Sequence, residues 1–226
     1  MNLVSLFSGS IESVLALLKA KEKGHEIKYL AAVHAKDGKK YLYQTTNIGL
    51  TLMQSQTIKI QLVSKEAKGN EEFEDLKVLL NGLSCEGVVC GLVENKRERR
   101  IIKKVCKELN LKLLTPLWGL KKDEMLEEVV KNRLEAIITA VTDSDEGLLG
   151  RVMDEKVMAE LKSKDCDVFS ENGKFEAIVL DCRAFQRSIK ITKDSKQWNS
   201  ETKSGKLMIE DAVLASKTDE QKIYNN

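Results

Sequence analysis

The chain has little of several residue types on which common catalytic and structural devices depend. Its 226 residues include one proline, two histidines and only 5% aromatic residues. Because His25 and His34 are the only histidines, a histidine-based nucleophilic triad has few candidates. No apolar run is long enough to span a membrane, and no basic segment leads into an apolar stretch at the start. We therefore expect neither a membrane segment nor a signal peptide.

The cysteines are scattered and odd in number. Cys85 and Cys90 form the closest pair, with four residues between them, and no Cys/His cluster lies nearby. Metal binding by these side chains is therefore not expected. Free thiols in a reducing compartment are the better interpretation, which predicts a cytoplasmic protein. The five cysteines are Cys85, Cys90, Cys106, Cys166 and Cys182.

Charge is abundant but balanced. The sequence holds 37 Lys and Arg residues against 35 Asp and Glu residues, a net charge of +2. This balance favours neither nucleic acid nor a membrane as the partner of the whole chain. The densest positive segment is a predicted basic helix within residues 96–107. A solvated helix face is its default interpretation and an RNA or ribosome-linked partner is the alternative, although aromatic residues do not interleave with the cations.

Apolar segments alternate with amphipathic ones up to Gly119, which predicts an α/β domain with a doubly wound parallel sheet over residues 1–118. The predicted strands are Leu3–Phe7, Ile27–His34, Thr57–Val63, Gly87–Val93 and Leu111–Leu114. The predicted helices are Ser13–Lys23, Thr46–Gln54, Glu71–Leu83 and Glu98–Leu109.

The pattern then changes, which predicts a smaller α+β domain over residues 119–226. Its predicted helices are Lys122–Lys131 and Asp154–Lys164, and its predicted strands are Ala136–Val141, Asp167–Ser170, Phe175–Asp181 and Ser188–Thr192.

The segment Ser8–Ser13 carries the strongest local signal. It joins the first predicted strand to the first predicted helix and supplies hydroxyls and backbone N–H groups at the positive end of a helix dipole. It has neither the Gly-Lys-Ser/Thr of a Walker loop nor the glycine spacing of a dinucleotide fingerprint. Since ligands of such sheets bind beyond the carboxyl ends of the strands, the segment is a candidate anion site. A plain strand-to-helix turn is the alternative.

Ser8-Gly9-Ser10-Ile11-Glu12-Ser13 resembles the Ser-Gly-Gly-x-Asp-Ser loop of the PP-loop ATP pyrophosphatases. Further blocks, in order along nearly the whole chain, resemble one branch of that superfamily, the diphthine–ammonia ligase family. These blocks are Tyr41–Thr45, Thr115–Gly119, Leu149–Arg151 with Asp154, Glu171–Glu176 followed by Leu180-Asp181, and Ser204–Leu207.

The resemblance implies a PP-loop fold of the adenine nucleotide α-hydrolase type and an ATP-dependent ligase. Such an enzyme converts diphthine on elongation factor 2 to diphthamide with ammonium, and releases AMP and pyrophosphate. The implied cofactors are ATP and Mg²⁺, and the implied partners are elongation factor 2 and ammonium. No membrane or nucleic acid is implied, and a homo-oligomer is left open.

The implied site residues follow from the matching blocks. ATP would contact Ser8, Gly9, Ser10 and Ser13, with His34 as a further candidate at a strand end. Glu12 would bind Mg²⁺ and take part in catalysis, and Glu171 and Glu176 would capture ammonium and remove its proton. The candidate substrate-binding residues are Tyr43, Gly150, Arg151 and Gly173.

Several residues depart from the family pattern. Ser10 replaces a glycine and is expected to disfavour a positive φ, and Glu12 replaces an aspartate. Lys174 stands where the family has a glutamate, and the family's tyrosine and arginine after the fourth strand are absent from residues 95–101. These departures leave two alternatives, a PP-loop enzyme acting on tRNA and a catalytically inactive ATP-binding protein.

Overall fold

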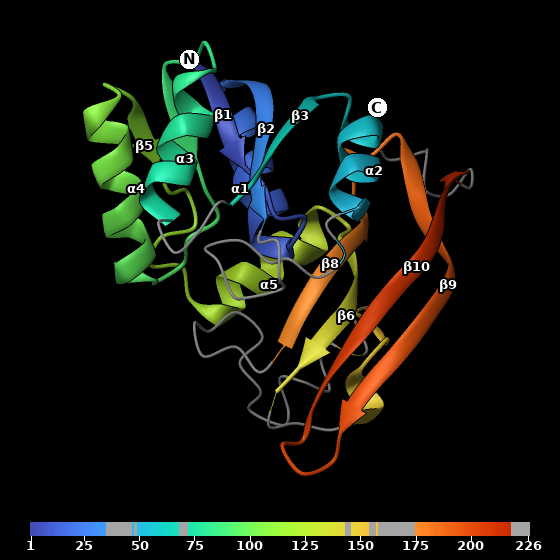
Figure 1. Cartoon of the computed structure of the whole chain (residues 1–226). Coiled ribbons are helices and arrows are strands. Elements are labelled where there is room, and N and C mark those ends of the chain that lie inside the picture. The colour runs from blue at the N-terminus through green and yellow to red at the C-terminus, as the bar shows by residue number, and fades with distance from the viewer. Residues whose placement is uncertain are drawn as a thin grey trace. The chain divides into compact units, whose positions relative to one another are not determined.

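The computed structural model describes residues 1–34, 47, 49–67, 72–142, 146–153, 157 and 175–217 (Figure 1). The chain divides into two compact units, Met1–Gly119 and Leu120–Asn226. No helix among the described residues is long and apolar enough to cross a membrane.

The first unit is built on a five-stranded parallel sheet with the order β3-β2-β1-β4-β5. Four helices connect its strands, which confirms the predicted parallel α/β architecture. The strands are β1 (Asn2–Leu6), β2 (Glu26–His34), β3 (Gln61–Glu66), β4 (Gly87–Val89) and β5 (Lys112–Leu114). The helices are α1 (Ile11–Glu22), α2 (Gly49–Ile58), α3 (Glu72–Asn81) and α4 (Lys96–Glu108).

Helices cover both faces of this sheet. Val4 and Leu6 of β1 share one buried cluster with Leu76 of α3 and Ile102 and Val105 of α4. The residues between them on β1 point to the opposite face, because side chains alternate along a strand. Figure 1 shows α3 and α4 together on one side of the sheet and α1 and α2 on the other. The predicted doubly wound arrangement is therefore confirmed.

The strand order reverses beside β1. From β1 the chain adds β2 and β3 in one direction, then returns to place β4 on the other side of β1. In open α/β sheets this switch point leaves a crevice at the carboxyl ends of the two central strands, where ligands bind. The segments that follow β1 and β4 leave the sheet at this point, which makes the Ser8–Ser13 loop a candidate ligand site.

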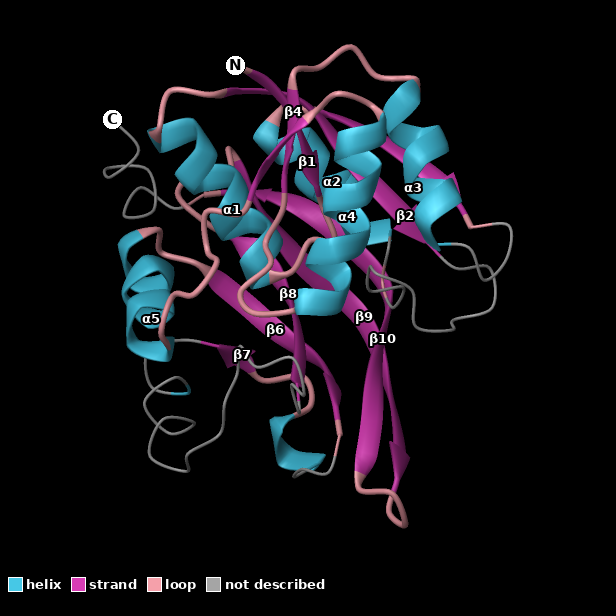
Figure 2. Ribbon diagram, turned by 90° about the vertical axis from the view of Figure 1, so that its left-hand side faces the viewer, coloured by secondary structure: helices cyan, strands magenta, loops and turns pink. Residues whose placement is uncertain are grey.

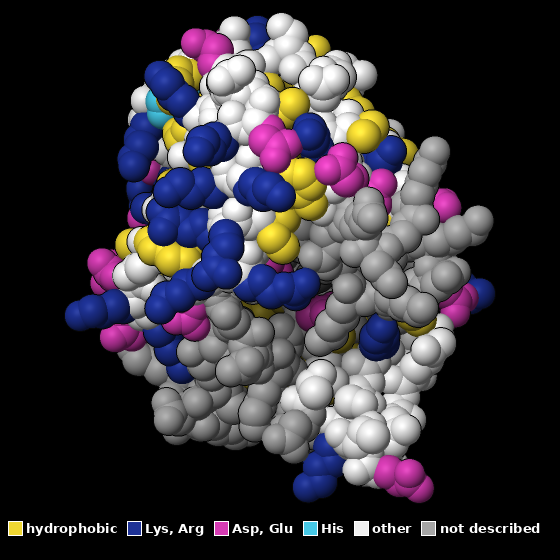
Figure 3. Space-filling view, turned by 60° about the vertical axis from the view of Figure 1, so that its left-hand side comes forward, with side chains coloured by type: hydrophobic (Ala, Val, Ile, Leu, Met, Phe, Trp, Pro, Cys, Tyr) yellow, Lys and Arg dark blue, Asp and Glu magenta, His cyan; other side chains and the backbone are white. Residues whose placement is uncertain are grey.

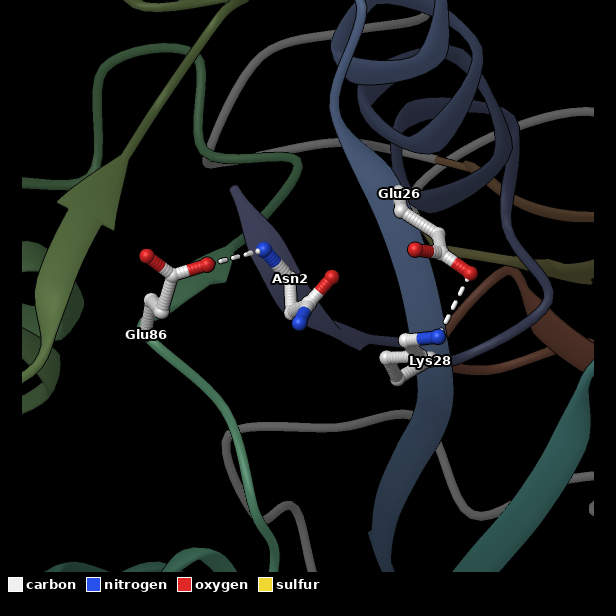
Figure 4. A network of polar contacts seen from close by, with 4 residues as sticks. All are labelled: Asn2, Glu26, Lys28 and Glu86. Atoms are coloured by element: carbon white, nitrogen blue, oxygen red, sulfur yellow. Dashed lines mark hydrogen bonds and ion pairs between the residues drawn. The ribbon is translucent and has the colours of Figure 1, made fainter.

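Polar contacts support the amino-terminal ends of the strands, on the side of the sheet opposite the switch-point loops (Figure 4). The backbone N–H of Asn2 donates to Glu86 Oε2 at 2.6 Å, which ties the start of β1 to the residue before β4. Beside it, Lys28 pairs with Glu26 at 2.6 Å on the exposed start of β2. These surface contacts support the strand register at the edge far from the crevice.

Two predicted strands in this unit have wrong boundaries. The predicted strand Thr57–Val63 begins inside α2, and the observed strand starts only at Gln61. Its β-branched residues suggested a strand, but Thr57 and Ile58 are buried in the last turn of the helix. The predicted strand Gly87–Val93 ends early, at Val89, so its last four residues form the loop after β4.

The second unit is an α+β assembly with an antiparallel sheet of order β7-β6-β10-β9, and β8 pairs with β6. Its described elements are α5 (Lys122–Lys131), β6 (Glu135–Val141), the 3-10 helix Glu146–Leu148, β7 (Val152–Met153), β8 (Phe175–Asp181), β9 (Arg187–Asn199) and β10 (Ser204–Ser216). The predicted elements Asp154–Lys164 and Asp167–Ser170 lie outside the described residues, apart from Val157.

The strands β9 and β10 form a long two-stranded ribbon (Figure 2). The sequence predicted only Ser188–Thr192 as a strand, whereas each observed strand has 13 residues. Most of β9 is exposed and polar, so it has no apolar run from which its length could be predicted. Its pairing with β10 determines its length, and that pairing is not encoded locally.

A buried ion pair links the carboxyl ends of β8 and β10. Lys217 follows β10 and places its Nζ 2.7 Å from Asp181 Oδ1 at the end of β8. The same ammonium group donates to the carbonyl of Cys182 at 2.8 Å. The Lys217 side chain is 3% exposed and the Asp181 side chain 7%, so the pair is nearly withdrawn from water. Burial raises the pKa of Asp181, and the hydrogen bond from Lys217 counteracts that rise.

Candidate active site

The Ser8–Ser13 loop turns directly from β1 into α1. Gly9 has a φ of +80°, a conformation that glycine adopts at little cost, and Ser10 is the N-cap of α1. Ser10 Oγ accepts the N–H of Ser13 at 3.3 Å, and Ser13 Oγ donates to the carbonyl of Ser10 at 3.0 Å. The loop is therefore a compact turn with its hydroxyls ordered around the helix N-terminus.

This turn has the chemistry of an anion site. Ser8 Oγ lies 3.1 Å from Ser10 Oγ and accepts the N–H of Ser10 at 3.4 Å. Ile11 and Glu12 form the first turn of α1, where the helix provides no acceptor for their N–H groups. Hydroxyls and first-turn N–H groups at a helix N-terminus are the donors that phosphate groups require.

The expectation that Ser10 disfavours the loop conformation is wrong. Ser10 has φ −71° and ψ 167°, an ordinary extended conformation. Only Gly9 needs a positive φ, so the second glycine of the family pattern is replaced without backbone strain. The serine side chain also contributes the N-cap hydrogen bond, which a glycine lacks.

Gln54 of α2 supports the loop through a hydrogen bond, a role that the sequence analysis missed. Its side chain is fully buried, and Nε2 donates to the carbonyl of Gly9 at 3.0 Å. A Cβ atom on Gly9 would lie 2.3 Å from Gln54 Oε1, so the two residues are in close contact. Half of the residues of α2 are polar, so the sequence offers no signal that singles out Gln54.

We expect Gly9→Ala to weaken ATP binding and to destabilise the protein by about 1–3 kcal/mol. The left-handed backbone conformation strains alanine, and its Cβ collides with Gln54. Gly24→Ala is the matched control, because Gly24 has φ +77° but no atom within 4 Å of an added Cβ. Calorimetric titration with ATP and thermal unfolding measure both effects. Parent-like ATP affinity in Gly9→Ala would remove the loop from the binding site.

Glu12 is a half-buried residue in the first turn of α1. Burial raises its pKa, while hydrogen bonds from its own backbone N–H and from the Ser10 side chain lower it. Gly91, in the loop after β4, packs against this residue. A Cβ atom at Gly91 would lie 2.5 Å from the Glu12 carbonyl oxygen, so the close approach fixes the position of Glu12 at the crevice.

Two further candidate segments lie at the carboxyl ends of other strands of this sheet. His34 ends β2, is half-buried, and accepts the N–H of Ala67 at its carbonyl at 2.8 Å. The Thr115–Gly119 block follows β5 and is joined to the loop after β4, because the N–H of Gly119 donates to Val93 O at 2.9 Å. In this block the ring of Trp118 lies 4.1 Å from the guanidinium carbon of Arg99.

In the second unit, blocks that are distant in sequence converge on the end of β6. The N–H of Gly150 donates to the carbonyl of Ile138 at 2.9 Å, and the carbonyl of Arg151 accepts from Ile138 at 3.0 Å. Ala140 pairs with Glu176 of β8 on one side and with Lys206 of β10 on the other. Glu176 is half-buried there. Glu176, Gly150 and Arg151 are therefore all held by one strand.

Gly205 explains why the Ser204–Leu207 block needs a glycine. It pairs with Trp198 on β9, and a Cβ atom would lie 2.6 Å from the Trp198 ring. Leu149 packs at the same position, with a side-chain carbon at 3.2 Å. The aromatic ring thus covers the glycine and links two of the sequence blocks.

Three of the predicted site residues, Tyr43, Glu171 and Gly173, lie outside the described residues, as does Lys174. Among the residues that the structure describes, no group of three His, Cys, Asp or Glu side chains could hold a metal ion. Glu12 provides a single carboxylate, the ligand type that Mg²⁺ takes in proteins when phosphate oxygens and water complete its shell. The loop and Glu12 therefore fit a magnesium–nucleotide complex.

Cys85, Cys90, Cys106 and Cys182 are free thiols. Burial raises the pKa of Cys90, Cys106 and Cys182 to about 12, and it raises that of half-buried Cys85 as well. Because the thiolate is the reactive form, the three buried thiols are inert at neutral pH.

We expect iodoacetamide to label Cys85 before Cys90, Cys106 and Cys182 in the native protein, and to label all four after unfolding. Peptide-resolved mass spectrometry measures the order. Equal rates for Cys85 and Cys90, or a native disulfide between them, would contradict this assignment of exposure and redox state.

The sheet order, the switch point and the hydroxyl-rich loop at a helix N-terminus define a PP-loop α/β protein of the ATP-binding type. Family profiles give the particular family. The diphthamide synthase N-terminal domain matches residues 1–113, and the diphthamide synthase C-terminal domain matches residues 121–215. The chain therefore belongs to the diphthamide synthase family.

Relatives with assigned activities agree with this membership. The chain is 28% identical over 219 residues to a diphthine–ammonia ligase of Schizosaccharomyces pombe, covering 85% of this chain but 36% of that protein. It is 28% identical to the Rattus norvegicus ligase and 27% identical to the Homo sapiens ligase, covering 84% of this chain and 83% and 82% of theirs. A predicted tRNA methyltransferase subunit from Methanocaldococcus jannaschii aligns with a TM-score of 0.44 at 14% identity, over 80% of this chain and 97% of that chain.

Proposed function

We propose that this protein is an ATP-dependent ligase that converts diphthine on elongation factor 2 to diphthamide with ammonium, releasing AMP and pyrophosphate. The observation that carries the proposal is the match of both diphthamide synthase domains to a chain whose Ser8–Ser13 loop lies at the switch point. The relatives named as diphthine–ammonia ligases support the same reaction.

The first unit would bind and orient ATP. Ser8, Gly9, Ser10 and Ser13 would hold the phosphates through hydroxyls and first-turn N–H groups, and His34 would contact the nucleotide from β2. The substrate carboxylate attacks the α-phosphate and pyrophosphate leaves. Fixed donors at the loop stabilise the charge that develops on the leaving group, because they need no reorganisation during the step.

Mg²⁺, when bound, would neutralise phosphate charge, and Glu12 is the residue that would hold it. The raised pKa of Glu12 shows that burial disfavours its ionised form, and a bound cation would favour that form. The longer side chain in place of aspartate keeps the charge and changes only its reach. Gly91 and the helix N-terminus fix the backbone from which that side chain extends.

Residues of the second unit would serve ammonium and the protein substrate. Glu176 and Glu171 would bind ammonium and accept its proton as ammonia displaces AMP from the acyl adenylate. Gly150, Arg151 and Gly173 would contact the diphthine-bearing segment, and Tyr43 of the first unit is a separate candidate for substrate binding. The hydrogen bonds that hold Gly150 and Arg151 on β6 support a fixed substrate-contacting surface.

The experiment that tests the proposal follows the nucleotide products. With diphthine-bearing elongation factor 2 and ammonium, the protein should form AMP and pyrophosphate, and omission of either substrate should stop product formation. ATP binding without any AMP would support an inactive ATP-binding protein. AMP formation that depends on tRNA would support the alternative enzyme.

A further inference from the structure

The exposed side of α4 is a continuous basic stripe. With 100° between successive residues, its six exposed cationic side chains fall within roughly a third of the helix circumference. Buried Ile102, Val105 and Cys106 lie on the other side. Figure 3 shows the dark blue side chains gathered over this face of the molecule. The stripe consists of Lys96, Arg97, Arg100, Lys103, Lys104 and Lys107.

The acidic residues of α4 offset only part of its positive charge. The helix itself carries two acidic residues, Glu98 and Glu108. Glu108 pairs with Lys77 of α3 at 2.6 Å, and the hydrogen bond from Lys77 lowers the pKa of Glu108. The chain as a whole has a net charge of only +2, so the stripe is a local concentration of positive charge. Such a patch attracts an acidic partner.

The aromatic rings beside the stripe are already covered by cations. Lys104 lies 4.3 Å and Lys77 5.7 Å from the centre of the Phe73 ring, and Arg99 covers Trp118 at 4.1 Å. Proteins that bind single-stranded nucleic acid offer open aromatic faces on which bases stack. Four of the six stripe cations are lysines, which lack the planar guanidinium fork with which arginine recognises nucleic acid. These features favour a carboxylate-rich protein surface over RNA.

The stripe begins beside the nucleotide-binding crevice. Asn95, in the segment after β4, caps α4 by accepting the N–H of Glu98 at 2.8 Å. From there the stripe runs from Lys96 to Lys107, about 17 Å along the helix. A protein whose side chain enters the crevice would therefore place neighbouring surface over α4.

We propose that the α4 stripe docks an acidic surface of the protein substrate, an inference that rests on the proposed function. The stripe would steer the substrate toward the crevice and act on association rather than on chemistry. It therefore sets the apparent affinity for the protein substrate and its salt dependence, while saturating turnover and ATP affinity stay at the parent values.

The test is the triple variant Arg100→Glu/Lys103→Glu/Lys107→Glu. Its matched control, Lys21→Glu/Lys23→Glu/Lys28→Glu, makes the same charge change at exposed positions near the amino-terminal edge of the sheet. We expect the stripe variant to raise KM for diphthine-bearing elongation factor 2 about tenfold or more at low salt, with kcat and ATP affinity unchanged. Its KM should also depend less on salt than that of the parent.

A direct binding measurement separates this proposal from the proposed function. Poly-L-glutamate should bind the parent protein and not the stripe variant, whether or not the protein amidates elongation factor 2. Tighter competition by duplex RNA than by poly-L-glutamate would overturn the proposal in favour of a nucleic-acid surface. A KM in the stripe variant equal to that of the control would overturn it as well. Absence of amidation by the parent, with intact poly-L-glutamate binding, would overturn the proposed function and with it the docking role.

Discussion

Glu12→Gln is expected to lower pyrophosphate release on the order of 100-fold while ATP binding and the fold persist. The amide keeps the size of the side chain and removes the negative charge that Mg²⁺ requires. Glu12→Asp should retain the rate or improve it, because the charge remains and only its reach changes. Rates of pyrophosphate release with saturating elongation factor 2 and ammonium measure the effect.

The pH profile gives this prediction a second readout. Burial raises the pKa of Glu12, so its carboxylate ionises at a higher pH than an ordinary glutamate. Because Mg²⁺ binds the ionised form, the parent's affinity for Mg²⁺ should rise as pH increases through that raised pKa, and the Gln variant should lack this dependence. Glu26→Gln, a change at a 63% exposed carboxylate on the far edge of the sheet, is the control. Parent-like turnover in Glu12→Gln would exclude Glu12 from the metal site.

Lys217→Met should reduce the free energy of unfolding by about 3–5 kcal/mol, because it leaves the Asp181 carboxylate buried without its partner. The double variant Lys217→Met/Asp181→Leu should recover most of the loss, since both buried charges are then gone. Urea unfolding of the two single variants and the double variant measures this coupling. Lys193→Met breaks an exposed pair with Glu210 and should change stability little.

The sign of the pH dependence follows from Asp181. Its pKa is raised in the folded protein, and loss of Lys217 raises it further. A carboxyl group whose pKa is higher in the folded than in the unfolded protein stabilises the fold at low pH. That stabilisation is lost as pH rises through the folded pKa. The deficit of Lys217→Met should therefore be smaller at acid pH than at neutral pH. An equal deficit at both would show that the variant loses packing rather than charge compensation.

Much of the first unit could be predicted because its signals are local. Apolar strands alternating with amphipathic helices specify a parallel sheet, and the small residues of Ser8–Ser13 specify a turn into a helix. The boundary errors arose where tertiary packing overrides local preference. Thr57 and Ile58 are β-branched but end a helix, and Cys90 and Leu92 are apolar because they pack from a loop into the core that β1 shares with α3 and α4.

The contacts that support the candidate site could not be predicted, because they join residues far apart in sequence. Gln54 reaches Gly9 across 45 positions, and Gly91 packs on Glu12 from the loop after β4. In the second unit, Gly150, Glu176 and Gly205 meet on β6 only through the pairing register. Strand register depends on side chains of both partners, so it cannot be read from either strand alone.

The most direct measurement follows isotope-labelled ammonium into elongation factor 2. With diphthine-bearing factor, ATP and Mg²⁺, mass spectrometry should find the label in an amide at the modified histidine, with AMP and pyrophosphate formed in equal amounts. Glu12→Gln should abolish the incorporation. An unlabelled factor after prolonged incubation with a protein that binds ATP would contradict the ligase function directly.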